Sequence, residues 1–167
     1  MANIKLPYFG TMDPADLEEY YDTDIEFNGR QVQLDINFES RAITIERLDT
    51  VKQFIENLRI HDLNNKKYLI SDFDNEDGDT VRFYIEKQLE ELATDDLYEL
   101  VGAGAKSKDQ PHLLLKKIHL VRVGLYPENT EQFAVFDYSI GKELTNHVVV
   151  ITTDENGNLD QITMESL

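Results

Sequence analysis

The chain of 167 residues contains no cysteine. It therefore has no disulfide bridges, thiolate metal ligands or cysteine nucleophile, which is typical of proteins from a reducing compartment. Long apolar runs are also absent. The longest covers residues 148–151, whereas a bilayer-spanning helix needs about 20 apolar residues. Residues 1–5 lack the basic start of a signal peptide. We therefore expect a soluble, cytoplasmic protein with no membrane partner.

Basic residues are scarce in this sequence. It has 16 Lys and Arg against 33 Asp and Glu, a formal net charge of −17 at pH 7. Nucleic-acid binding depends on Lys and Arg side chains that displace counterions from phosphates, so this balance argues against DNA or RNA as a partner. A basic protein is the complementary partner.

The length and composition favour a single domain that spans residues 1–167. Hydrophobic residues make up 41% of the chain, which is enough for one packed core. Small and polar residues at 102–111 indicate an internal loop, which Pro111 closes. Neither side of this loop would bury a large core alone, so we do not expect a domain boundary there.

The first 40 residues predict a short strand, a short helix and a hairpin. Residues 4–9 favour a strand interrupted at Pro7, because proline has no N–H to donate. Asp13 followed by Pro14 is a helix-start signal and predicts two helical turns up to Tyr21. Further on, the dipeptide Asn28-Gly29 predicts a type I′ hairpin turn. The strand after it places apolar residues on its inner face at every second position: Val32, Leu34, Ile36 and Phe38.

Helical periodicity dominates the middle of the chain. Apolar residues from Leu48 to Leu58 recur three and four positions apart and predict a core-facing helix. A weaker helical pattern covers 63–71. A third helix is expected after the acidic loop, from Val81 to Leu92, with residues 97–101 as its extension. Gly102 then occupies the position of a helix C-cap glycine.

After Pro111 the pattern predicts strands throughout. The runs cover 113–125, 132–140, 146–153 and 159–164, and short turn segments separate them. Short connections favour antiparallel neighbours. We therefore expect an α+β fold in which a C-terminal four-stranded antiparallel meander and the N-terminal hairpin pack against about three helices.

An acidic segment is the clearest candidate for a binding surface. Residues 72–99 contain eleven acids and two bases, a net charge of −9. No register of the loop at 72–79 places acids, glycine and glutamate as an EF-hand requires. The segment is interpreted as a docking face for a basic protein, because surfaces of one charge sign steer association; the alternative is a solvated face that confers solubility. The candidate docking residues are Asp72, Asp74, Glu76, Asp77, Asp79, Glu86, Glu90 and Glu91.

No local motif predicts catalysis. The four histidines lack zinc-site spacing, and serine-nucleophile and phosphate-loop motifs are absent. We therefore expect no enzyme activity, cofactor or metal. Asp137 is the one acid expected to be partly buried, as a hydrogen-bonded structural residue. The rival hypothesis is a small hydrolase or ligand-binding protein that assembles carboxylates from distant segments as acid and base.

Two stretches of the chain carry a resemblance to a known family. The first joins residues 17–21 (LEEYY) to 25–30 (IEFNGR). The second joins 135–141 (VFDYSIG) to 145–150 (TNHVVV) and 154–157 (DENG). They resemble a bacterial family of single-domain proteins known as a domain of unknown function, which implies a bacterial cytoplasmic protein and no active site. In size, charge and α+β build, the chain is also similar in style to small acidic immunity proteins, which implies a non-catalytic module that binds a basic partner.

Overall fold

The computed structural model describes residues 3–167 and shows an α+β fold, as predicted. Six strands form one sheet in chain order. They are β3 (Tyr20–Phe27), β4 (Arg30–Asn37), β5 (His119–Leu125), β6 (Ala134–Ser139), β7 (His147–Thr153) and β8 (Leu159–Ser166). A separate small hairpin near the N-terminus contains β1 (Ile4–Leu6) and β2 (Gly10–Met12).

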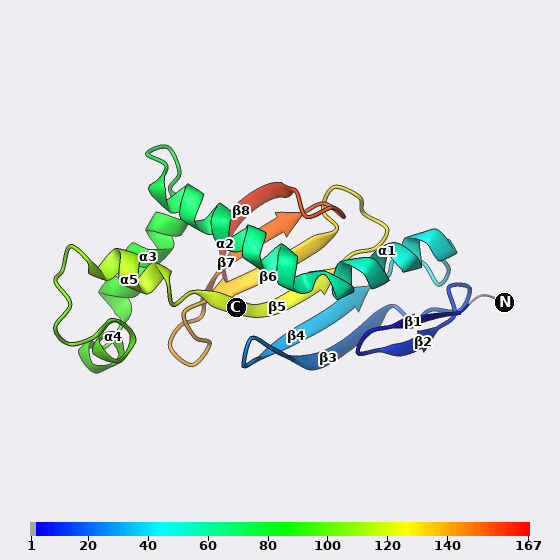
Figure 1. Cartoon of the computed structure of the whole chain (residues 1–167), viewed down its shortest axis with the longest axis horizontal. Helices are drawn as coiled ribbons and strands as arrows, with labels where there is room; N and C mark the ends of the chain where they lie inside the picture. Colours follow the sequence, from blue (N-terminus) through cyan, green and yellow to red (C-terminus); the bar gives the residue numbers. More distant parts are fainter. Residues whose placement is uncertain (1–2) are drawn as a thin grey trace.

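The five helices of residues 3–167 occupy one face and one end of the sheet (Figure 1). Two helices cross the face: α1 (Ile45–Glu56) and α2 (Leu58–Asp74). The other three helices cluster at the end: α3 (Thr80–Glu91), α4 (Thr94–Val101) and α5 (Gln110–Leu115). In this part of the chain no helix covers the opposite sheet face, which we call the open face. No helix of residues 3–167 has the length and apolar character needed to cross a bilayer.

The sheet is larger than predicted and it is mixed. Strands β5 to β8 form the expected antiparallel series, but β4 pairs with β5 in parallel, with Gln33 opposite Arg122 and Ile36 opposite Leu125. The expected four-stranded sheet is therefore only the C-terminal part of a six-stranded one. A parallel pair requires a long crossover connection, here the helical middle of the chain, and such a pairing leaves no local pattern in the sequence.

The predicted hairpin turn is present between β3 and β4. Asn28 and Gly29 have φ angles of 51° and 78°, as a type I′ turn requires. The apolar side chains of the second strand face the helices and are buried, as the alternation predicts: Val32, Leu34, Ile36 and Phe38.

Two further local predictions are wrong. The expected helix after Asp13 is instead a short turn, in which Ala15 N donates to Asp13 Oδ1 (2.9 Å), because the following residues extend to pair with β4. The strand expected to start at residue 113 starts at His119. Before it, Pro111 lies in the first turn of α5, and an apolar run as short as 113–115 suits a helix and a strand equally.

The helices also differ from prediction. The segment expected to extend α3 is a separate helix, α4, because the chain is extended at Ala93. Helix α2 begins at Leu58 and is much longer than the predicted 63–71. It buries polar residues, among them His61, Asp62 and Asn65. These interrupt the apolar stripe that would have revealed the whole helix.

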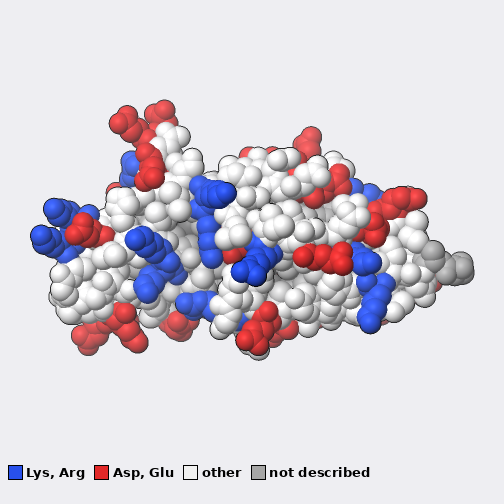
Figure 2. All heavy atoms as spheres, viewed as in Figure 1, with Lys and Arg blue, Asp and Glu red and all other residues white. Residues whose placement is uncertain are grey.

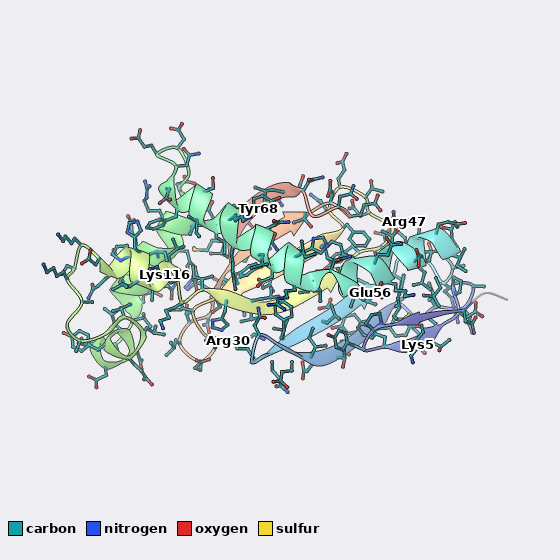
Figure 3. The ribbon with its side chains drawn as sticks, in the orientation of Figure 1. Lys5, Arg30, Arg47, Glu56, Tyr68 and Lys116 are labelled. Carbon is teal, nitrogen blue, oxygen red and sulfur yellow. The ribbon has the colours of Figure 1, made fainter. Side chains whose placement is uncertain are left out.

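Polar contacts secure α1 and α2 to the loops of the sheet. In α1, Arg47 donates through Nε to the carbonyl of Pro127 (3.0 Å) and through Nη1 to Glu155 Oε2 (2.5 Å). In α2, the Tyr68 hydroxyl donates to the carbonyl of Gly157 (3.1 Å). Arg47 and Tyr68 are labelled on their helices in Figure 3.

Gly157 provides a test of this packing. It has a φ of +82°, and a Cβ atom there would lie 2.5 Å from His61 Nδ1. The His61 ring stacks on Phe54 with ring centroids 4.0 Å apart, so it has little room to move. We expect Gly157→Ala to lower the free energy of unfolding by roughly 1–3 kcal/mol in chemical denaturation. Gly104→Ala is the control, since no atom lies within 4 Å of its Cβ position; an equal loss in both variants would contradict the prediction.

Candidate functional site

The eight acids predicted to form a docking face belong to the end of α2, the α2–α3 loop and helix α3. Asp74 is exposed at the end of α2, and Glu76, Asp77 and Asp79 are exposed in the α2–α3 loop, which projects from the upper edge of the molecule (Figures 1 and 2). Glu86 and Glu90 are exposed on α3. The remaining two acids, Asp72 and Glu91, contact other residues of the chain.

Asp72 and Glu91 make intramolecular contacts. Asp72 Oδ2 accepts a hydrogen bond from the backbone N–H of Val81 (2.9 Å) at the start of α3. Glu91 lies 3.4 Å from Lys87 Nζ. Among residues 3–167, Glu91 is the only one of the eight within ion-pair distance of a basic side chain. Most of this acidity is therefore uncompensated and faces solvent.

The open face contains a buried charge cluster, of which the sequence analysis named only Asp137. Arg122 on β5 binds Asp35 on β4 through two parallel hydrogen bonds, Nε to Oδ1 (2.8 Å) and Nη2 to Oδ2 (2.9 Å). Arg122 Nη1 also lies 3.6 Å from Asp137 Oδ2 on β6. Asp35 is 0% exposed and Asp137 is 6% exposed, although no helix covers them.

Neighbouring residues hold this cluster in place. Gly124 lies opposite Asp35 in the β4–β5 register, and a Cβ atom there would lie 2.6 Å from Arg122 Nη2. Glycine therefore leaves the space through which the guanidinium reaches Asp35. From β4, Asn37 Nδ2 donates to Asp35 Oδ2 at 2.7 Å.

The cluster contains two carboxylates and one cation. Burial raises the pKa of Asp137, and the nearby Arg122 offsets only part of that effect. Arg122 keeps its charge, because the hydrogen bonds and charge of Asp35 raise its pKa even though burial acts in the opposite direction. Arg122 therefore binds the Asp35 carboxylate through two hydrogen bonds, whereas the Asp137 carboxylate has only a longer contact with the same guanidinium. A raised carboxyl pKa is also found in general acids, but neither aspartate lines the cavities at the two ends of this face.

Acids outnumber bases on the open face as a whole. Because side chains alternate along a strand, the residues that share a face with Asp35 and Arg122 follow from the register. Along the edge strand β3 these include Asp22, Asp24 and Glu26, all exposed. Glu165 on β8 adds a further acid.

Tyr20, at the start of β3, is 48% exposed and accepts a hydrogen bond from Gln33 Nε2 (3.4 Å).

The sequence contained a usable signal for this cluster. Asp35, Arg122 and Asp137 each lie near the middle of a strand that contains many apolar residues. The positive charge of Arg122 is opposite to the negative charges of the two aspartates. The alternation correctly placed Asp35 away from the helices, but it implied solvent exposure, because nothing local showed that Arg122 would lie beside it. In residues 3–167 no group of three or more His, Asp or Glu side chains has metal-site geometry.

Comparison of the chain with protein-family models, curated proteins and solved structures finds no match. The resemblance to a bacterial domain family of unknown function therefore stays a prediction.

Replacing Asp35 tests the importance of the ion pair for stability. Asp35→Asn leaves the Arg122 guanidinium without its bidentate partner, and breaking a buried ion pair typically costs about 3–5 kcal/mol. We expect Asp35→Asn to lower the free energy of unfolding by roughly 3 kcal/mol, the lower end of that range, because the Arg122 side chain remains 27% exposed. Chemical denaturation measures the loss. A change below about 1 kcal/mol, the value typical of surface pairs, would contradict the prediction.

Replacing Asp137 should have a different, pH-dependent effect. The folded chain holds Asp137 at a pKa above its usual value of 3.8, so it binds that proton more tightly than the unfolded chain does. The wild type should therefore lose stability relative to Asp137→Asn as pH rises through the raised pKa, and the stability difference should become independent of pH below about pH 3. Denaturation curves from about pH 3 to pH 7 measure this. If Asp137→Asn instead lost stability relative to the wild type as pH rises, the predicted direction of the effect would be wrong.

Proposed function

We propose that this chain is a non-catalytic protein-binding module whose partner is a basic protein. The observation that carries the proposal is the open face, a sheet surface that no helix covers in residues 3–167 and on which acids outnumber bases. A strongly acidic surface selects partners of opposite charge and repels others. Inhibition of a basic toxin, as by an immunity protein, is the specific version of the proposal.

The open face has the features of a contact surface. Three exposed acids along β3, Asp22, Asp24 and Glu26, can pair with Lys or Arg of a partner. Tyr20 lies on the same face and is half exposed. Tyrosine is enriched among the residues that dominate binding energy, because it combines a large apolar surface with a polar end.

The acidic residues predicted from the sequence have a separate role in this proposal. Acids of the α2–α3 loop project from the body of the protein and have no basic partner within residues 3–167. Charges outside a direct contact chiefly change the association rate, because they attract the partner at long range. We therefore assign the loop to steering and the open face to contact.

The rival is a small hydrolase or ligand-binding protein that uses carboxylates. The raised pKa of Asp137 favours it, since perturbed acids concentrate at active sites. The burial of Asp137 beside Arg122, outside the cavities at the ends of the open face, favours a structural role instead.

Two matched variants test the proposal and separate the two surfaces. The partner is captured from the native cell, identified and purified, and its binding to the full chain is measured by surface plasmon resonance. The open-face variant is Asp22→Asn, Asp24→Asn and Glu26→Gln. The loop variant is Asp74→Asn, Glu76→Gln and Asp77→Asn, so each removes three charges.

The open-face variant should dissociate at least about tenfold faster, because it loses direct charged contacts. The loop variant should mainly associate more slowly, and this difference should shrink between low salt and 0.15 M, where the Debye length is about 8 Å. A partner that is not basic, or equal kinetics for both variants and the wild type, would refute the proposal. Hydrolysis of a substrate that is lost in Asp137→Asn would establish the rival.

A further inference from the structure

On the helix side of the sheet, four basic side chains from three separate elements surround one cavity. Arg30 lies at the β3–β4 turn, Lys66 on α2, and Lys116 and Lys117 between α5 and β5. The cavity has a volume of about 260 Å³, equal to that of about eight water molecules in the liquid. Figure 3 labels Arg30 and Lys116 near the start of β5, and Figure 2 shows Lys and Arg side chains across the middle of this face.

We propose that this cavity binds a small molecule that carries a phosphate group. The proposal does not rest on the protein-binding function proposed above, although Arg30 and His119 also line the neighbouring cavity that contains Asp24 of the open face.

The charge balance is the first argument. In a chain with 33 acids and 16 bases, basic side chains readily find carboxylate partners. Within residues 3–167, Arg30, Lys116 and Lys117 have no carboxylate within 4 Å. Three unpaired cations that surround one cavity repel one another, and an anion inside it would relieve that repulsion.

The single acid of the cavity wall is already engaged. Asp62 Oδ1 accepts a hydrogen bond from the buried Tyr138 hydroxyl (2.7 Å), and Oδ2 lies 3.2 Å from Lys66 Nζ. Asp62 therefore fixes the position of Lys66, whose side chain remains 40% exposed, and neutralises only one of the four cations.

The geometry suits a phosphate. Arg presents a planar fork of donors and Lys a compact point charge, and both bind phosphate oxygens. His119 also lines the cavity. Burial lowers the pKa of His119, and the positive charges of Arg30 and Lys66 act in the same direction. The hydrogen bond to the Lys117 carbonyl and the negative charge of Glu143 offset part of this effect. Lys116 and Lys117 also complement the C-terminal end of α5, but that role does not account for Arg30 and Lys66, which belong to other elements.

The test is a titration of the isotope-labelled full chain with sodium phosphate, followed by ¹H–¹⁵N NMR at constant pH and ionic strength. We expect saturable shifts at residues 28–30, 66 and 116–119. The double variant Lys116→Gln, Lys117→Gln should weaken binding at least about tenfold, as should Arg30→Gln, because each removes charged hydrogen bonds.

Lys106→Gln, Lys108→Gln is the matched control. It removes the same charge from exposed positions that do not line this cavity, and it should bind phosphate like the wild type. Absence of saturable shifts, or equal weakening in both double variants, would refute the site. Sodium acetate that binds as tightly as phosphate would refute the assignment to phosphate.

Discussion

The parallel pairing of β4 with β5 is the constraint on which the rest of the structure depends. Every other neighbouring pair in the large sheet is joined by a short turn or loop, whereas this pair joins segments separated by the whole helical region. The Asp35–Arg122 ion pair crosses the same boundary. A fully buried carboxylate is tolerated only when it is paired and hydrogen-bonded. Correct pairing of the two strands therefore requires the cation at 122 and the absence of a side chain at 124, which together disfavour other registers.

The two faces of the sheet divide the charges of the molecule. Helices α1 and α2 cover the apolar core on one side, where three unpaired basic residues, Arg30, Lys116 and Lys117, line the cavity at the start of β5. The other side has no helix in residues 3–167, and acids outnumber bases on it. The formal net charge of −17 conceals this separation. The two proposals therefore place a basic macromolecule and a small anion on opposite faces of the sheet.

Sequence reasoning succeeded where structure is local. The Asn28-Gly29 turn, the alternating strand after it and the apolar stripe of α1 each depend on residues a few positions apart. It failed where distant segments meet. Helix α2 was only partly detected because its inner side carries His61, Asp62 and Asn65, and Asp62 finds its partner Tyr138 on β6. The clusters around Arg122 and Arg30 were missed for the same reason: each combines elements that no sequence spacing relates.

The long connection between β4 and β5 also shapes how the chain folds. The β3–β4 hairpin closes through a two-residue turn and the strands from β5 onward through short loops, so both units form from local contacts. Joining them must close a loop across the helical region, and pairings between distant segments slow folding. Until that step, β4 and β5 each present an unpaired edge, which is the usual starting point of aggregation. Asp35 and Arg122 lie on those edges, so premature pairing of two identical edges would bring like charges together.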